Sequence, residues 1–256
     1  MKNFTFKSKY LFFTSTIVLV ILAWFIVSTI AKNEFVFPNI KQIFNSFIYI
    51  ITHKEILMLL SIVLKVLLCV VISTLISLFI VILYMLKKET IAFFEPILTF
   101  FRVVPILGII VYLFFVFNEI VTPYIITIIV IIPLMVEALK TAFDNLDPNI
   151  MDALKLEKIS FFKKVFRVYL PIIAPYFFMA LMQSFGLGIK SMIMGEYLCY
   201  TPNSIGSTLY DVKLSDSSML IAWLILIFIV TAMIEIGIKK FKKTVEQKNL
   251  RGSNLK

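Results

Sequence analysis

Residues 152–171 read DALKLEKISFFKKVFRVYLP, a charged stretch inside an otherwise apolar chain of 256 residues. Apolar runs long enough to cross a membrane lie on both sides of it. Within it, Phe162, Val165 and Tyr169 recur at three- and four-residue spacing, on the face opposite Lys163. This pattern predicts amphipathic helical turns along the inner lipid surface, ending where Pro171 opens the next membrane span.

The composition excludes a soluble globular protein. Hydrophobic residues make up 61% of the chain, charged residues 16%, and the mean hydropathy is +1.00. Soluble domains have about 45–50% apolar and about 25% charged residues. We therefore expect an all-α, polytopic membrane protein. The net charge of +10 does not indicate nucleic-acid binding, because the basic residues flank the apolar runs.

A membrane-spanning helix needs about 20 mostly apolar residues. About six runs fit this length, and together they predict one transmembrane domain over residues 1–256. The predicted spans are 10–31, 62–86, 103–118, 121–139, 170–198 and 217–238. The segment between the first two spans carries apolar residues at helical spacing over 40–48, which predicts an amphipathic helix at the outer interface.

The basic residues predict the orientation of these spans. They gather at the N-terminus, over 87–102, over 140–167 and over 239–256, while the alternate segments carry few. By the positive-inside rule, both termini are expected in the cytoplasm. The segment of about 140–169 is then a cytoplasmic loop between the fourth and fifth spans.

A short helix is predicted at the start of this loop. Asp147 can cap the free amides of a helix, and Pro148 suits its first position. Ile150, Met151 and Leu154 then share one face over about two to three turns. Either a soluble partner covers this apolar face or the helix lies in the lipid headgroups.

The loop resembles the cytoplasmic EAA loop of permease subunits in binding-protein-dependent ABC transporters. That motif reads Glu-Ala-Ala, three residues, Gly, nine residues, then Ile-x-Leu-Pro. Here Asp152, Ala153 and Leu154 stand at the first three positions, Lys158 replaces the Gly, and Val-Tyr-Leu-Pro closes the motif at 168–171. The spacing is kept throughout.

Four further stretches resemble the sulfonate, nitrate and taurine subgroup of these permeases. They occur in the order and at the spacing of that subgroup. The stretches are SIVLKVLL (61–68), FFEPILTFFRVVPILGIIVYLFFVFNE (93–119), GLGIKSMIMGEYL (186–198) and SIGSTLYDVKLSDSSMLIAWLILI (204–227).

The resemblance implies a permease subunit of an ABC importer in the bacterial inner membrane. It implies a homodimer that works with two ATPase subunits and an extracytoplasmic solute-binding protein. The short cytoplasmic helix is expected to dock in a groove of the ATPase, and the family motif places four contact residues there, with two more inferred from the apolar face. The expected contact residues are Ile150, Met151, Asp152, Ala153, Leu154 and Lys158.

The chain is expected to be a transport subunit and not an enzyme. No phosphate-binding G-x-x-x-x-G-K-[ST] motif occurs in it, so ATP and Mg are expected on the partner ATPase. The subgroup implies a small anion such as a sulfonate, taurine or nitrate as the solute. Related permeases also move thiamine-precursor pyrimidines, which is the alternative.

Two other classes of function stay open. An ion-coupled secondary transporter needs acidic residues at mid-membrane and inverted repeats, and the first four predicted spans have no central acid. A membrane-embedded enzyme needs a catalytic constellation, and the chain has a single histidine, His53. The cysteines Cys69 and Cys199 have no partner at metal-ligand spacing, so no metal site is expected.

The fifth span carries two groups of candidate residues. Small residues recur on one helix face, either lining the pathway or dimer interface, or packing against neighbouring helices. These residues are Ser184, Gly188, Ser191 and Gly195. Lys190 and Glu196 are candidates for attracting a substrate, but six residues of helix point them about 120° apart, so they do not pair. Lys190, like Lys65 in the second span, can also snorkel to the outer headgroups.

Overall fold

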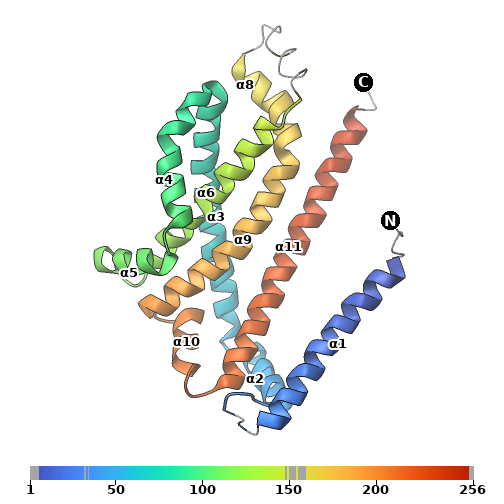
Figure 1. The fold of residues 1–256 in the computed structure, drawn as a ribbon, viewed down its shortest axis with the longest axis vertical. Coiled ribbons are helices and arrows are strands. Elements are labelled where there is room, and N and C mark those ends of the chain that lie inside the picture. Colours follow the sequence, from blue (N-terminus) through green and yellow to red (C-terminus); the bar gives the residue numbers. More distant parts are fainter. Residues whose placement is uncertain are drawn as a thin grey trace. The chain divides into compact units, whose positions relative to one another are not determined.

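The computed structural model describes residues 6–31, 33, 35–147, 149, 154 and 160–253, and every regular element in these ranges is a helix (Figure 1). The predicted all-α class is confirmed. The elements are α1 (Phe6–Ala31), α2 (Ile40–Thr52), α3 (Ile56–Leu86), η1 (Lys88–Thr90), α4 (Ile91–Val103), α5 (Ile106–Val116), α6 (Thr122–Asp144), α8 (Phe161–Lys164), η2 (Val165–Tyr169), α9 (Leu170–Cys199), α10 (Ile205–Val212) and α11 (Ser217–Ser253).

The chain divides into two compact units. One contains Met1–Ile56 and Leu209–Ile227, and the other contains Leu57–Thr208 and Phe228–Lys256. Each unit is therefore built from segments that lie far apart in the sequence. A single transmembrane domain over the whole chain stays a prediction.

In the first unit, the predicted amphipathic helix is α2. Asn39 and Gln42 form a reciprocal capping box at its start, each side chain bonding the other residue's backbone amide at 2.9 Å. The turn before it is held by Trp24 of α1, whose Nε1 donates to the Pro38 carbonyl at 3.2 Å. The hydroxyls of Ser46 in α2 and Ser218 in α11 lie 2.8 Å apart. These contacts connect three helices of this unit.

Four helices are long and apolar enough to cross a membrane. They cover 56–86, 122–144, 167–199 and 217–244, and they coincide with four of the predicted spans. α1 covers the predicted first span. Several helices of membrane-spanning length establish a polytopic membrane protein.

The predicted third span, 103–118, contains one helix, α5, and the chain bends sharply at the start of this span. α4 and α5 meet at an angle of 103° (Figure 1). Val104 between them is extended, with ψ 134°, because the residue before a proline is forced out of the helical region by Pro105. Helices of 13 and 11 residues are only about 20 and 16 Å long, short of a membrane core of about 30 Å. Pro105 causes the break, and a hydropathy pattern does not detect it because the residues on both sides are apolar.

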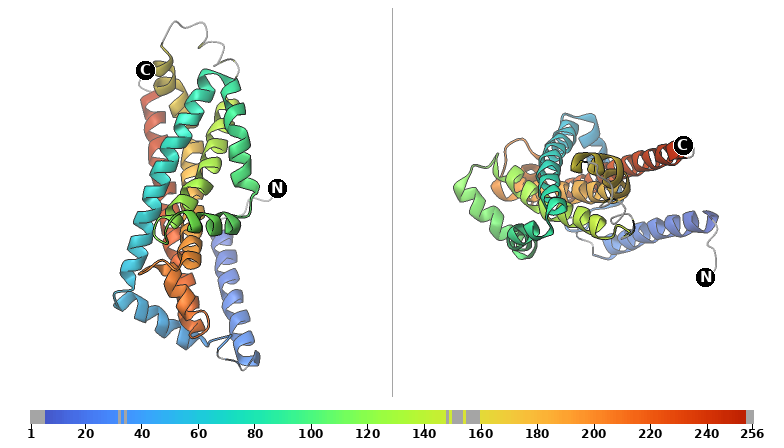
Figure 2. Two further views of the ribbon diagram at one scale, coloured as in Figure 1. Left: turned by 90° about the vertical axis from the view of Figure 1, so that its left-hand side faces the viewer. Right: turned by 90° about the horizontal axis from the view of Figure 1, so that it is seen from above.

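In the second unit, α6 and α9 run along one another (Figures 1 and 2). Small side chains of α3 join it to the backbone of α6. Ser73 Oγ donates to the Ile128 carbonyl and Ser77 Oγ to the Ile132 carbonyl, each at 3.3 Å. Without a hydrophobic force between helices in lipid, close packing and such hydrogen bonds hold membrane helices together.

The turns before Pro171 differ from the prediction. α8 and η2 run directly into α9, so 161–199 is continuous helix and not a separate surface helix. η2 is a π-helical turn, and this widening accommodates Pro171, which lacks the amide that a regular turn uses and crowds the carbonyl four residues earlier. Tyr169 is buried, with its ring 5.4 Å from that of Phe143 in α6.

Candidate functional site

The loop after α6, which is predicted to be cytoplasmic, begins as the sequence predicts. The Asp147 carboxylate accepts a hydrogen bond from the Asn149 amide at 2.8 Å, as an N-cap residue does. Most of the following segment lies outside the described residues. Of the six predicted ATPase contacts, five are in this part: Ile150, Met151, Asp152, Ala153 and Lys158.

Leu154 is the predicted contact residue that the structure describes. Its side chain is only 6% exposed and belongs to a core cluster of the permease itself. Four helices contribute to that cluster, through Tyr84 of α3, Leu98 of α4, Phe143 of α6 and Ile173 of α9. Leu154 therefore anchors the loop in the membrane helices, and its side chain does not face outward to a partner.

Polar contacts reinforce this anchor. Lys164 Nζ donates to the Leu154 carbonyl. At the end of α6, Asp144 accepts a hydrogen bond from the Tyr84 hydroxyl and lies 3.3 Å from Lys140 Nζ and 4.0 Å from Lys88 Nζ. Exposed ion pairs alone contribute little stability. The half-buried hydrogen bond to Tyr84 adds a directional contact between α3 and α6 at the root of the loop.

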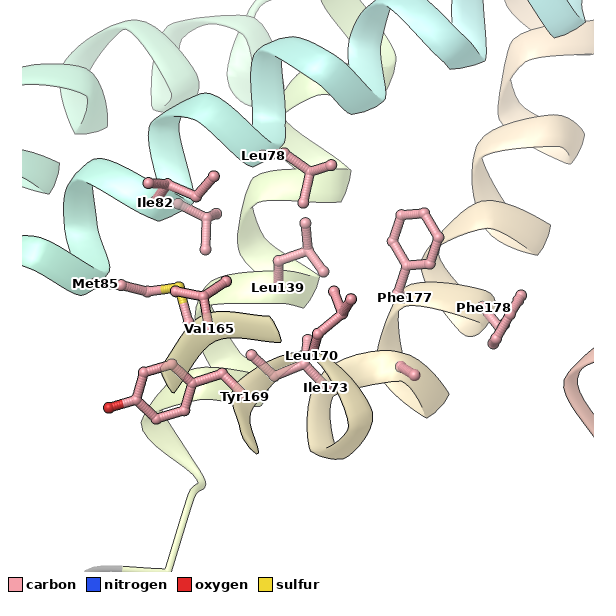
Figure 3. A pocket seen from close by; sticks show the side chains of 12 residues that line it. Leu78, Ile82, Met85, Leu139, Val165, Tyr169, Leu170, Ile173, Phe177 and Phe178 are labelled. Carbon is pink, nitrogen blue, oxygen red and sulfur yellow. The ribbon is translucent and has the colours of Figure 1, made fainter. Parts of the chain in front are cut away.

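A cavity of about 360 Å³ lies beside this anchor, between α3, α6 and the start of α9 (Figure 3). Its lining includes Leu78, Met85, Ile173 and Phe177, and the Tyr169 hydroxyl points away from the other lining side chains (Figure 3). A charged solute needs polar partners when it leaves water. This apolar cavity does not supply them.

A second cavity, of about 540 Å³, lies between α4, α5, α6 and α9. Its lining combines apolar side chains with Arg102, Glu137 and Gln183. Arg102 Nη1 lies 3.1 Å from Glu137 Oε2, and these side chains are 44% and 51% exposed. This is a polar, accessible site on helices that are otherwise apolar.

The small-residue stripe of α9 is buried inside the unit. Ser184, Gly188, Ser191 and Gly195 are all buried. A Cβ atom on Gly188 would meet Val66 Cγ1 at 2.9 Å. One on Gly195 would come equally close, 2.9 Å, to the Cα of Pro123 in α6. The stripe brings α9 close to α3 and α6, which matches the packing interpretation; a pathway role stays a prediction.

Lys65 does not snorkel to the headgroups. Its Nζ lies 2.7 Å from Glu196 Oε1, with the side chains 20% and 1% exposed. The other oxygen, Glu196 Oε2, accepts from the Gly206 amide at 3.3 Å. Both carboxylate oxygens are therefore used inside the protein, because a charge buried in the membrane needs partners. Glu196 is not accessible to a solute.

Lys190 is exposed, and among the described residues it has no ion-pair partner. Gln183, Leu187 and Lys190 follow one helix face at steps of four and three residues. Gln183 and Leu187 line the second cavity. Lys190 therefore stands on the same face, about one turn further along α9.

Sequence reasoning missed two ion pairs that cross between helices. Arg102 was counted only as an orienting charge, and Glu137 stood near the end of a predicted span. The available signal was an ionisable residue inside an apolar helix, which marks a functional position in membrane proteins. For Lys65 and Glu196, 131 residues apart, the sequence carries no pairing signal.

Two comparisons with known proteins bear on identity. No curated protein matches the chain. The family described as "Binding-protein-dependent transport system inner membrane component" matches residues 84–238, which is more than half of the chain. The matched region runs from the end of α3 into α11 and includes the loop after α6 and every lining residue of the second cavity. The chain belongs to this family and is a permease subunit of an ABC transporter.

Proposed function

We propose that this chain forms the translocation pathway of an ATP-driven importer for a small solute with an anionic group, such as a sulfonate, taurine or nitrate. Two copies would span the bacterial inner membrane with both termini in the cytoplasm. ATPase subunits, which bind ATP and Mg, and an extracytoplasmic solute-binding protein would complete the transporter. A thiamine-precursor pyrimidine is the alternative solute.

The burial of Leu154 carries the coupling part of the proposal. Leu154 connects the cytoplasmic loop to side chains of α3, α4, α6 and α9 in one buried cluster. Side chains in contact within such a cluster shift together. An ATPase that moves the loop of 148–158 would therefore move four membrane helices together. This movement would shift the equilibrium between the inward-open and outward-open states.

The polar face of α9 supports the pathway part of the proposal. Gln183 and Lys190 are exposed on that face, and Gln183 lines the cavity that holds the Arg102–Glu137 pair. In a membrane domain, such groups face water or protein and not lipid. Lys190 would attract the anionic group of the solute, while the buried stripe beginning at Ser184 would hold the helices that frame the pathway.

The test is ATP-driven uptake by the chain reconstituted with its proposed ATPase and solute-binding protein partners. Replacing Ala153 with Glu places a charge in the predicted docking segment, so it should abolish ATP-driven uptake and weaken co-purification of the ATPase. Lys239→Gln is the matched control, since it changes an exposed pair 3.9 Å from Glu235. Unchanged uptake and co-purification with Ala153→Glu would contradict the coupling role.

A further inference from the structure

Arg102 of α4 and Glu137 of α6 form an ion pair between these two helices. Arg102 is the twelfth residue of α4, roughly 16 Å from its start, and Glu137 lies about 10 Å before the end of α6. Isolated charges at such depth are strongly unfavourable in lipid. Charges in membrane segments pair with one another and face protein or a water-filled cavity, and this pair lines the second cavity.

The pair is also too open to be a packing device. With 44% and 51% of their side chains exposed, both groups keep hydrogen-bonding capacity toward the cavity. The guanidinium has five donors and the carboxylate has two acceptor oxygens, so one contact of 3.1 Å leaves most of them free. Gln183 of α9 adds an amide to the same cavity.

We propose that this cavity binds a small zwitterion during transport, with its oxyanion group on Arg102 and its ammonium group on Glu137. The inference rests on the proposed function, because it assigns the solute class of that permease. A sulfonate or carboxylate matches the planar fork of the guanidinium. An ammonium group gives a carboxylate three charge-assisted donors.

Charge balance favours a zwitterion over a simple anion. An anion that replaces Glu137 as the partner of Arg102 leaves the half-exposed carboxylate with water alone and no charge partner. A cation leaves Arg102 unpaired in the same way. A zwitterion exchanges one ion pair for two, so every charge stays compensated while the solute is held.

The rest of the cavity suits a molecule of this kind. Its volume of about 540 Å³ falls within the range of about 300–1,000 Å³ that is typical of small-molecule sites. Phe101, Val130 and Leu187 line it around the polar groups, which suits a short aliphatic chain between the two charges. Lys190, on the same face of α9, would favour approach with the oxyanion group first.

Binding can be measured directly on the full chain assembled with its ATPase in nanodiscs. The probe is tritiated 2-aminoethanesulfonate, with glycine and 3-aminopropanesulfonate as further zwitterions. The competitors are 2-hydroxyethanesulfonate, which lacks the ammonium group, and nitrate. We expect the zwitterions to bind and the two anions to compete at least roughly tenfold more weakly, as loss of a charge-assisted contact predicts.

Three variants separate binding from structure. Arg102→Gln and Glu137→Gln should each weaken zwitterion binding roughly tenfold or more. The double variant keeps the shape of both side chains and leaves no unpaired charge, so it should assemble normally and still fail to bind. Lys239→Gln, at an exposed pair of α11, should bind like the wild type.

The outcomes are distinct. Three results would overturn the proposal. The first is wild-type binding by the double variant, and the second is competition by nitrate as strong as by the zwitterions. The third is that no zwitterion binds up to about 10 mM, a concentration that fills sites with a Kd near 1 mM. If the wild type binds zwitterions but shows no ATP-driven uptake of any solute, the importer function fails and the site stands. If wild-type uptake is driven by ATP and all variants transport equally, the site fails and the importer function stands.

Discussion

Lys65 Nζ and Glu196 Oε1 lie 2.7 Å apart and join α3 to α9 through a nearly solvent-free ion pair. The Glu196 carboxylate also accepts a hydrogen bond from the backbone amide of Gly206, the second residue of α10. One acidic side chain thus joins α3, α9 and the first residues of α10 within the second unit. Its position at the end of α9 makes it a structural junction, and this replaces the substrate-attracting role predicted for Glu196.

Replacing Glu196 with Gln should lower the apparent Tm of the purified protein. Removing one partner of a buried pair leaves the other charge uncompensated, which costs about 3–5 kcal/mol. Lys65→Met combined with Glu196→Gln should recover part of this loss, because neither charge then remains. Thermal unfolding followed by circular dichroism measures both. A Glu196→Gln protein as stable as Lys239→Gln would contradict the junction role.

Gly206→Ala should disrupt the same junction from the other side. An added Cβ would collide with the backbone of Glu196 and Tyr197, which cannot move as a side-chain end can. We expect α10 to be displaced from α9 and the Gly206–Glu196 hydrogen bond to be lost. Faster amide hydrogen exchange over residues 205–212 is the measurement, and unchanged protection would show that the contact is dispensable.

The glycines of the α9 stripe should differ in their tolerance of alanine. Gly195→Ala forces a Cβ against Pro123 Cα, a backbone atom, so we expect a loss of about 1–3 kcal/mol. In Gly188→Ala, the added Cβ meets the side-chain ends of Val66 and Ile131. These ends can shift, so the loss of unfolding free energy should be smaller. Gly108→Ala is the control, since no atom lies within 4 Å of its Cβ position.

Apparent Tm values in one detergent compare these three proteins. The expected order of stability is Gly108→Ala, then Gly188→Ala, then Gly195→Ala. The reverse order for the two stripe positions would mean that α6 can move away from α9, and the packing interpretation would be wrong.

Leu154→Ala should uncouple ATP hydrolysis from transport. Truncating a buried leucine costs about 2–5 kcal/mol, and here the loss falls on the contact between the loop and the helix cluster. In the reconstituted importer we expect ATP hydrolysis to continue while uptake falls several-fold. Leu214→Ala, at a residue 75% exposed, is the matched control. Equal uptake by both variants would remove Leu154 from the coupling route.

Much of the fold is readable in the sequence, because lipid imposes simple rules. An apolar run of spanning length must be helical to satisfy its backbone, so four of the predicted spans appear as α3, α6, α9 and α11. The cap at Asp147 depends only on the next two residues and is confirmed. The break between α4 and α5 was missed because hydropathy does not register the local constraint of Pro105.

The sequence by itself determined that this is an all-helical membrane permease, that the loop after α6 begins at Asp147, and that small residues recur on one face of α9. Composition, caps and periodicity are local properties, so the sequence carries them directly. Only the tertiary structure decided which charges meet: Glu196 with Lys65 and Glu137 with Arg102. It also decided that Leu154 anchors the loop from within. These outcomes depend on which helix faces approach one another, and close packing between distant segments settles that.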